Sequence, residues 1–505
     1  MKTRTVFAAD LGASGGKCFV GVFKESGFKM HEIHRFEHEP VDFFVQESRG
    51  KLSVRTYWDD ILLYNNIIKG LKKYRREFSP ELDAIGIDTW GTDGHFITPT
   101  GEFLGKIYCY RDHRLDNMCE ELARILPRER IYEITGIHFW PFNISNQLLW
   151  FSKYRKYLLE IADVFLPMPT VFLYYLGGVK KIDTSWASVT QVMDARKKAW
   201  SREILSAIGI PETMMPEIVH PGTICGEIYE EIASQCKINR AKLICVASHD
   251  TASAYIAAPA EKNSNNLIIS SGTWSLVGRL IDEPITTEKA LNANLSNEGG
   301  VGNIRLLKNC MGTWPIQQLL KLWEEEDGQK MSWDEVVKLV EKAPPFNGFI
   351  DPDNQIFYNP DNMEKAIIGY LKRTGQRVKL ERGTLLRVIY ESLAMKYRYV
   401  KEQIDDVCGT PSEMLNIVGG GSKNALLNQF AADATGLRVI TGPEEATAVG
   451  NIMLQGIALG IINSIDEAHE LIRSAFSIKE YLPKNFKKWD SEYSKFLKIL
   501  KMEIN

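Results

Sequence analysis

Two glycine-rich segments, each directly after a short apolar run, contain residue types that could bind a phosphate group. The first is residues 10–17 (DLGASGGK), and the second is residues 270–275 (SSGTWS). Turns of such small residues can present backbone N–H groups to phosphate oxygens. The carboxylate of Asp10 adds a ligand type that hydrated Mg²⁺ prefers. Together these segments predict a binding site for ATP and magnesium between two related domains.

The first turn differs from the phosphate-binding loop that has the pattern G-x-x-x-x-G-K-[ST]. The interval from Gly12 to Gly16 is one residue too short, and Cys18 occupies the place of the hydroxyl residue that binds magnesium. Residues 17–23 also have the pattern of a strand, whereas a helix follows such a loop. We therefore predict a hairpin turn whose amides face phosphate. The alternative is a tight turn without a ligand.

Asp250 lies between an apolar run and the small residues 251–254 (TASA), which are typical of the start of a close-packed helix. An acid in this place can draw the proton from a substrate hydroxyl as that hydroxyl attacks phosphorus. An aspartate at a helix start can also be a simple N-cap. The spacing leaves both interpretations open.

Two further segments have the residue types of a sugar or nucleoside site. Residues 88–94 (DTWGTDG) combine acids that can bind hydroxyl groups with an indole that can cover the apolar face of a sugar. Residues 138–143 (HFWPFN) could extend that pocket or pack in the core. For Phe139 we favour the core. The glycines of residues 419–422 (GGGS) would let the backbone approach a base or ribose, unless they form a flexible connector.

Hydrophobic periodicity predicts the elements that position these segments. Strands over 4–10 and 17–23 with a short turn between them favour a hairpin. A helix is expected over 58–77 and a buried strand over 84–88. The chain from residue 256 repeats this plan, with strands at 267–271, 274–280 and 415–418 and helices near 312–325, 333–342, 383–407 and 424–429. This recurrence predicts two duplicated α/β domains with a cleft between them.

Length and composition set the remaining bounds. A chain of 505 residues exceeds one ordinary core, so we predict an N-terminal domain of residues 1–256 and a C-terminal domain of residues 257–505, with the softest boundary at 257–266. The 44% apolar and 25% charged residues are typical of soluble globular proteins. A net charge of −3 argues against a nucleic-acid partner or an anionic membrane surface.

No stretch approaches the ~20 apolar residues of a membrane span, and the N-terminus lacks a signal-peptide pattern, so we expect a cytoplasmic protein. The eight cysteines include no C-x-x-C pair, which argues against a disulfide framework and against a zinc site. His31, His34 and His38 lie in a polar stretch without sustained helical spacing, and we do not expect them to bind a metal.

Ordered motifs over nearly the whole chain resemble those of the FGGY carbohydrate kinases. They are residues 10–14 (DLGAS), 86–91 (GIDTWG), 110–112 (YRD), 135–137 (TGI), 141–143 (PFN), 247–254 (ASHDTASA), 271–276 (SGTWSL), 297–300 (NEGG), 307–309 (LKN) and 418–422 (VGGGS). The long strings around Asp250 and Gly272 are the most specific, because a broader group of sugar kinases shares only the glycine turns and the acid.

The resemblance implies the actin-like ATPase fold, in which two ribonuclease H-like α/β domains close over their substrates. It places the sugar on the N-terminal side and the nucleotide on the C-terminal side. It also implies transfer of a phosphoryl group from ATP, with Mg²⁺, to the 1-hydroxyl of L-rhamnulose. The alternatives are another ketose, such as fuculose or xylulose, and a non-catalytic actin-like ATPase that polymerises or binds partner proteins. The oligomeric state stays open.

Residue by residue, the resemblance implies that Asp250 is the catalytic base, that Gly91, His249, Thr251 and Asn309 also contact the sugar, and that Asp10 holds Mg²⁺ through water. It implies ATP contacts at Ala13, Ser14, Gly15, Gly16, Lys17, Thr273, Gln317, Gly419, Gly420 and Gly421.

The chain departs from the family pattern at two places. Lys17 stands where the family usually has arginine, which keeps the charge but loses the guanidinium fork. In residues 92–96 (TDGHF), Gly94 follows the acid, where the family usually has an apolar or aromatic residue. We therefore predict an altered rim of the sugar pocket.

Overall fold

The computed structural model describes residues 3–25, 27–46, 50, 52–261 and 264–502. The chain forms two compact units that are discontinuous in sequence. The first unit comprises Met1–Ala257, Leu280–Leu306 and Glu445–Phe476, and the second comprises Ala258–Arg279, Leu307–Glu444 and Ser477–Asn505. Part of the expected boundary stretch, residues 262–263, lies outside the described residues. The assignment of residues 1–256 to the sugar and 257–505 to the nucleotide stays a prediction.

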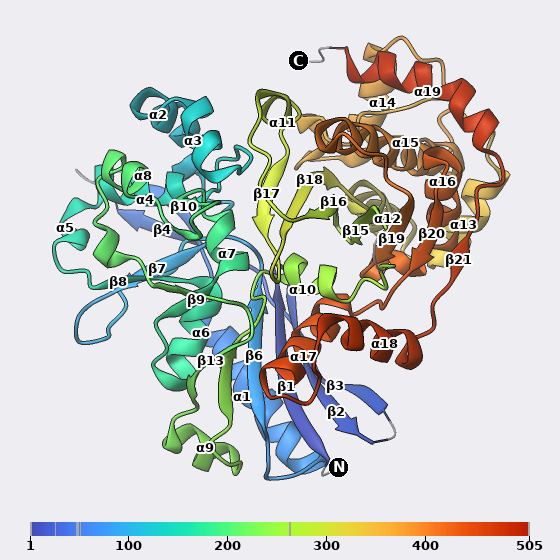
Figure 1. Ribbon diagram of the computed structural model, residues 1–505. Coiled ribbons are helices and arrows are strands. Elements are labelled where there is room, and N and C mark those ends of the chain that lie inside the picture. Colours follow the sequence, from blue (N-terminus) through green and yellow to red (C-terminus); the bar gives the residue numbers. More distant parts are fainter. Residues whose placement is uncertain (1–2, 26, 47–49, 51, 262–263, 503–505) are drawn as a thin grey trace. The chain divides into compact units, whose positions relative to one another are not determined.

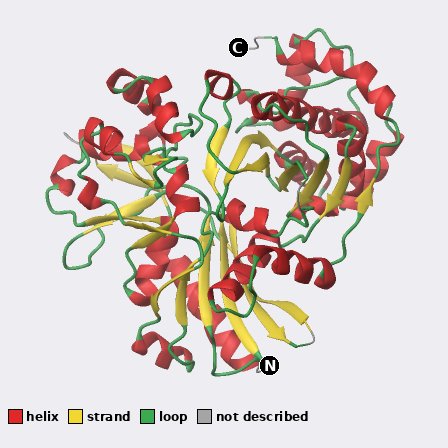
Figure 2. Cartoon of the chain, viewed as in Figure 1, coloured by secondary structure: helices red, strands yellow, loops and turns green. Residues whose placement is uncertain are grey.

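A six-stranded sheet forms the centre of the first unit (Figures 1 and 2). Its order is β13 (Thr223–Glu227), β14 (Lys242–Cys245), β6 (Ala84–Thr89), β1 (Arg4–Gly12), β2 (Gly15–Lys24) and β3 (Gly27–Glu37). Strands β1 and β2 are antiparallel with Gly12 opposite Gly15, so the predicted hairpin is confirmed and no helix follows the first turn. Strands β1 and β6 are parallel, which brings their carboxyl ends to the same edge.

Helices cover both faces of this sheet. Helix α1 (Asp60–Glu77) is capped by Asp59, whose side chain accepts from the Leu62 amide. It packs on one face, where a Cβ at Gly70 would meet Phe7 and Cys18. Helix α17 (Ala446–Ala458) packs on the other face, with Ile452 against Gly21. Helix α10 (Asp250–Ile256) lies directly against α17.

The remaining elements of the first unit surround this frame. They are β4 (Val41–Gln46), β5 (Leu52–Tyr57), β7 (Gly94–Ile97), α2 (Met118–Ile125), α3 (Arg128–Thr135), α4 (Ile144–Tyr154), α5 (Lys156–Leu159), β8 (Val164–Pro167), α6 (Met168–Gly177), β9 (Lys181–Asp183), α7 (Thr184–Val189), β10 (Met193–Asp194), β11 (Ala199–Trp200), α8 (Arg202–Ala207), β12 (Glu217–Val219), α9 (Glu230–Cys236), α11 (Glu288–Asn292), β17 (Ser296–Gly299) and α18 (Ile465–Ala475).

The second sheet repeats the plan of the first, as predicted. Its seven strands have the order β17, β18 (Ile304–Met311), β16 (Trp274–Ile281), β15 (Asn266–Ser271), β19 (Met414–Val418), β20 (Arg438–Thr441) and β21 (Glu480–Tyr481). Strands β15 and β16 again form a hairpin, and β15 is parallel to β19. The helices of the second unit are α12 (Trp314–Asp327), α13 (Trp333–Lys342), α14 (Met363–Arg373), α15 (Arg382–Cys408), α16 (Ala425–Thr435) and α19 (Phe486–Leu500). The third glycine turn is a 3₁₀ helix (Gly420–Lys423) rather than an open loop.

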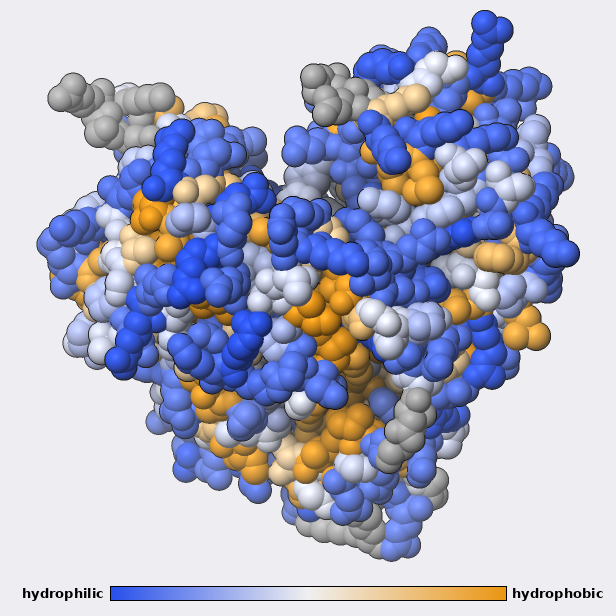
Figure 3. All heavy atoms as spheres, turned by 45° about the horizontal axis from the view of Figure 1, so that its top comes forward, coloured by the Kyte–Doolittle hydropathy of each residue, from blue (hydrophilic) through white to orange (hydrophobic). Residues whose placement is uncertain are grey.

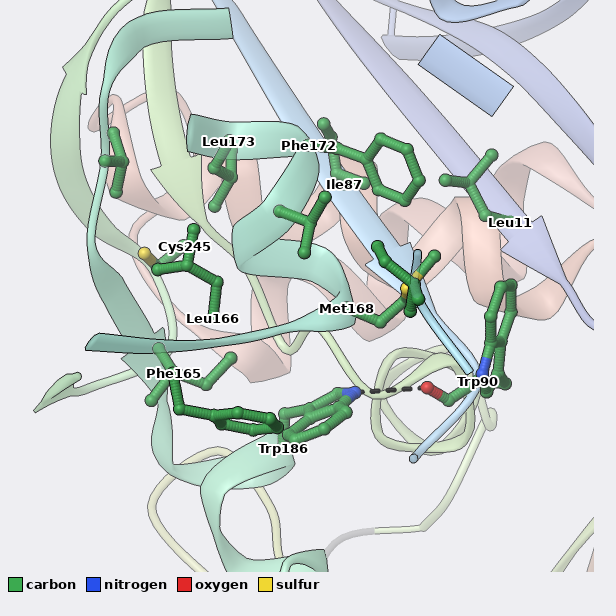
Figure 4. Packing of buried hydrophobic residues seen from close by; sticks show 14 of the residues in the cluster. Leu11, Ile87, Trp90, Phe165, Leu166, Met168, Phe172, Leu173, Trp186 and Cys245 are labelled. Atoms are coloured by element: carbon green, nitrogen blue, oxygen red, sulfur yellow. Dashed lines mark hydrogen bonds between the residues drawn. The ribbon is translucent and has the colours of Figure 1, made fainter. Parts of the chain in front are cut away.

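A buried hydrophobic cluster holds the strand ends of the first unit in place (Figure 4). In it, the Trp186 indole N–H donates to the Trp90 carbonyl over 3.1 Å. This bond fixes the backbone directly before Gly91. Phe139 is only partly buried against the cluster, so the expectation that it belongs to the core is met in part.

Hydrophilic residues cover most of the face drawn in Figure 3, and hydrophobic residues gather in a few patches. Among the described residues, no helix has both the length and the apolar character needed to cross a bilayer. All eight cysteines are free thiols, which agrees with the expected absence of a disulfide framework. His38 binds the Gly12 carbonyl and His34 binds Asn66, so both rings have structural partners.

Candidate active site

Four acidic side chains lie near the ends of β1 and β6, those of Asp10, Asp88, Asp250 and Glu445. Asp10 and Asp88 lie opposite each other in the parallel pairing of these strands. Burial raises the pKa of Asp10 to about 7; the charges of Asp250 and Glu445 raise it too, whereas Lys17 opposes the shift. Asp88 is fully buried and accepts from the Asn451 amide of α17. Burial and the neighbouring Asp10 also raise the pKa of Asp88. This edge therefore concentrates negative charge that a cation would stabilise.

Asp250 is the first residue of α10, and the N-cap of that helix is His249. The alternative that Asp250 is the N-cap is therefore wrong. Its Oδ1 atom accepts from the Thr251 amide over 2.6 Å and from the Thr251 hydroxyl over 3.1 Å. The side chain is 30% exposed, and burial raises its pKa to about 6. A carboxylate of this kind is ionised near neutral pH and remains basic enough to accept a proton.

His249 and Gly91 form one contact beside this carboxylate. The His249 Nε2 atom lies 3.4 Å from Asp250 Oδ1. A Cβ added at Gly91 would lie 2.6 Å from the same Nε2 atom, so the ring needs a glycine there. A backbone bond from the Thr89 amide to the Ser248 carbonyl, 2.9 Å long, ties the two segments together. The structure thus brings together Gly91, His249, Asp250 and Thr251.

The first glycine turn is partly exposed, and its lysine has an acidic partner. Ser14 is exposed, whereas Gly16 packs under Phe36. Lys17 Nζ lies 2.6 Å from Glu445, the N-cap residue of α17. Arg35, opposite Lys17 on β3, contacts the same carboxylate over 3.1 Å. Glu445 therefore contacts two cations, Lys17 from β2 and Arg35 from β3.

Two family models match most of the chain. The N-terminal domain model of the FGGY family of carbohydrate kinases matches residues 54–257, and the C-terminal domain model matches residues 267–459. The chain belongs to the FGGY family of carbohydrate kinases.

Individual relatives agree with this assignment. The chain is similar to a rhamnulokinase of Bacteroides thetaiotaomicron, with 37% identity over 97% of this chain and 98% of the relative. It is also similar to a rhamnulokinase of Lactiplantibacillus plantarum, with 34% identity over 98% of each chain. The structure of gluconate kinase from Lactobacillus acidophilus superposes with a TM-score of 0.77 at 16% identity, over 99% of this chain and 98% of that one. The fold of this carbohydrate kinase is accordingly the actin-like ATPase fold.

The remaining residues that are predicted to bind ATP lie in the second unit of this kinase: Thr273, Gln317 and Gly419–Gly421. The Thr273 hydroxyl donates to Gln317 Oε1 over 3.4 Å, and the Gly312 amide donates to the Thr273 carbonyl over 3.0 Å. Gly419 has a φ of 83° and lies against the Ser271 carbonyl, and a Cβ at Gly421 would clash with the Ser271 side chain. The turn after β15 and the glycine turn after β19 therefore pack together, which only small residues allow. Asn309 also belongs to this unit, apart in sequence and unit from the other predicted sugar contacts.

Residues 92–96, which we predict to alter the rim of the sugar pocket, form the start of β7 and the segment before it, and their place at that rim stays a prediction. All five are buried. Asp93 accepts from the indole N–H groups of Trp58 and Trp90 over 2.7 and 3.1 Å, and from the Tyr110 amide over 3.1 Å. The acid therefore holds two indoles whose ring centroids are 4.3 Å apart and whose planes are tilted by 39°. Asp93 therefore has a structural role two residues after Gly91.

Four residues of the site had no role predicted from the sequence. Glu445 contacts Lys17, Asn451 donates to Asp88, and Glu298 and Arg305 lie at His249. The best available signal was Arg305, a charged residue inside the apolar strand pattern of residues 304–307 (IRLL). Glu445, Asn451 and Glu298 contact Lys17, Asp88 and His249, which are distant from them in the sequence, and local patterns do not report such contacts.

Replacing Gly91 by alanine is expected to lower kcat/KM for the sugar by roughly tenfold or more, because the new methyl group displaces the His249 ring and small misplacements in a site are costly. Steady-state kinetics would measure the change. Gly369→Ala is a matched control, since the nearest atom to its Cβ, Arg373 Nη1, is 3.5 Å away. An unchanged kcat/KM in Gly91→Ala would contradict the assigned contact.

Proposed function

We propose that this kinase transfers the γ-phosphoryl group of ATP to the 1-hydroxyl of L-rhamnulose. The support for this substrate is that relatives named rhamnulokinase align with nearly the whole chain at 34% and 37% identity. The support for the chemistry is the partly buried carboxylate of Asp250, which the first unit holds beside Gly91, His249 and Thr251.

In this proposal Asp250 is the catalytic base. The hydrogen bonds that its side chain accepts from described residues end on Oδ1, so Oδ2 is the oxygen that would take the proton of the attacking hydroxyl. Gly91, His249, Thr251 and Asn309 would contact the sugar. The turn residues Ala13–Lys17 in the first unit, with Thr273, Gln317 and Gly419–Gly421 in the second, would bind ATP.

The carboxylates at the end of β1 fit the magnesium ion that this reaction requires. Among the described residues, no group of three or more His, Cys, Asp and Glu side chains could hold a metal by itself. A hydrated Mg²⁺ needs only one or two carboxylates, with water and phosphate oxygens completing its shell. Asp10 is partly exposed and would hold the ion through water. When bound, Mg²⁺ neutralises charge on the transferred phosphate group.

An ADP-release assay across L-rhamnulose, L-fuculose, D-xylulose and a sugar-free control tests the proposal. We expect kcat/KM to be highest for L-rhamnulose by at least about tenfold, a difference that one changed substituent in a pocket can supply. A higher value for another ketose would overturn the proposed substrate. ADP release that ignores every sugar, together with ATP-dependent filaments, would favour the non-catalytic actin-like alternative.

Activity is expected to fall as the pH drops below about 6, because burial raises the pKa of Asp250 to about 6 and only the ionised carboxylate accepts a proton. A plot of log kcat/KM against pH would show a limb with that apparent pKa. A profile that stays flat well below pH 6 would contradict the assignment.

Ionisation of the Asp250 carboxyl, which is expected to raise activity, is expected to lower the folding stability. The folded state keeps this proton to a higher pH than the unfolded chain, whose carboxyl titrates near 3.8. Its contribution to stability is therefore complete below pH 3.8 and is lost as the pH rises through about 6. Urea unfolding of wild type and Asp250→Asn at both ends of the profile would isolate this contribution.

A further inference from the structure

Arg305 is a fully buried cation that touches the histidine next to the proposed base. It lies on β18, and its partner Glu298 lies on β17 (Figure 1). Arg305 Nε donates to the Gly299 carbonyl over 2.9 Å, and Nη2 lies 3.1 Å from a carboxylate oxygen of Glu298. The same Nη2 atom lies 3.1 Å from Nδ1 of His249. Two contacts thus hold the guanidinium group in place, and the third is made with the ring nitrogen itself.

This contact decides which nitrogen of His249 carries the proton. A guanidinium group has only donors and does not deprotonate in proteins. Nδ1 must therefore be the bare acceptor, and a neutral ring then carries its hydrogen on Nε2. The ring is neutral because burial and the charge of Arg305 lower the pKa of His249.

Glu298 is the competing neighbour, since its Oε2 atom lies 3.4 Å from His249 Nδ1. A hydrogen on Nδ1 could point to that oxygen, but it would then also face the cationic Nη2 group at the shorter distance of 3.1 Å. Nη2 is hydrogen-bonded to Nδ1, whereas its 3.1 Å contact with Glu298 Oε2 is an ion pair, because that oxygen accepts no hydrogen bond from the described residues. A bare Nδ1 accepts the hydrogen bond from Nη2, whereas a protonated Nδ1 would set two donors against each other.

We infer that Arg305 is a positioning residue that holds His249 in the Nε2–H tautomer, so that the ring presents a donor to the Asp250 carboxylate. Nε2 faces Asp250 Oδ1 at 3.4 Å, the oxygen that already accepts from Thr251. The Nε2–H group of His249 therefore faces the oxygen that Thr251 already binds, and Oδ2 is left for the substrate proton. Only the catalytic consequence rests on the proposed function, because the tautomer is a property of the protein without substrate.

The tautomer can be measured directly. Long-range proton–nitrogen correlation spectra of protein with isotope-labelled histidine distinguish a protonated from a bare ring nitrogen. The His249 signals among the nine histidines are those lost in His249→Asn. We expect the nitrogen coupled to both ring C–H protons, Nε2, to be the protonated one. A protonated Nδ1 in the wild-type protein would overturn the inference, whatever the enzyme's substrate proves to be.

Variants of the two neighbours separate Arg305 from Glu298. Glu298→Gln should keep the Nε2–H tautomer, and a change of tautomer in it would overturn the inference. Arg305→Lys, which cannot serve all three partners at once, should yield a mixture of tautomers. It should also lower kcat by roughly 10-fold to 100-fold, the range for losing one hydrogen bond to a charged group, with a smaller change in KM.

The control is Arg279→Lys, a change at another buried arginine, whose guanidinium group donates to the Thr410 carbonyl in the second unit. It should leave the His249 spectrum unchanged. If Arg305→Lys fails to fold, the wild-type and Glu298→Gln spectra still decide the question. If the tautomer is as inferred but no ketose is phosphorylated, the proposed function fails and the inference about Arg305 stands.

Discussion

Replacing Asp250 by asparagine is expected to lower kcat by roughly 10²-fold to 10⁴-fold, the usual contribution of a general base, while sugar binding is kept. The amide has nearly the shape of the carboxylate, so the oxygen that accepts from Thr251 can remain in place. It cannot take the proton of the attacking hydroxyl. The loss should therefore appear in kcat, with little change in the affinity for the ketose.

Single-turnover kinetics and calorimetric titration with the ketose would separate these two effects. Asp334→Asn is the matched control, because Asp334 lies in the first turn of α13 and the same chemical change there affects only a helix start. Near-normal turnover of Asp250→Asn would remove this residue from the role of base.

Replacing Gly450 by alanine is expected to destabilise the protein by about 1–3 kcal/mol, as overpacking usually does, and to lower kcat by roughly 100-fold. A Cβ at this position of α17 would collide with the backbone carbonyl of Ser253 in α10. Backbone cannot yield as a side chain does, so the two helices must separate. Because α10 begins at Asp250, their separation moves the proposed base, and a shift of about 1 Å can cost that factor.

Urea unfolding and kinetics on the folded fraction would measure both effects. Gly456→Ala in the same helix is the matched control. Its nearest contact, 2.8 Å away, is the end of the flexible Ile462 side chain, which can move at little cost. If Gly450→Ala were no less stable and no less active than Gly456→Ala, the close packing of α10 and α17 would not position the base.

Several features of the fold follow from local patterns. The small residues between the two strand patterns near the N-terminus predicted a hairpin, and β1 and β2 form it with Gly12 opposite Gly15. The same strand pattern after Lys17 excluded the helix that a P-loop requires. The recurrence of this unit near residue 267 predicted the second sheet, and β15 and β16 confirm it. Such features depend on residues close together in the chain, so periodicity and turn chemistry suffice.

The setting of Asp250 could not be predicted in this way. Its sequence neighbours were compatible with both an N-cap and a base, and the structure places the N-cap one residue earlier. The sequence likewise did not reveal that residues 92–96 are buried, with Asp93 accepting hydrogen bonds from Trp58, Trp90 and Tyr110. In both cases the deciding partners depend on packing between separate elements, which a local pattern does not encode.

The sequence by itself determined the family, the duplicated α/β plan and the identity of the acid proposed as the base, because these depend on ordered motifs and local periodicity. Only the tertiary structure decided what surrounds that acid: the carboxylate of Glu445 at Lys17, the carbonyl of Ser253 beneath Gly450, and the guanidinium group of Arg305 at His249. Burial, charge and proton position at a site depend on which distant residues pack there, and packing is settled only when the whole chain folds.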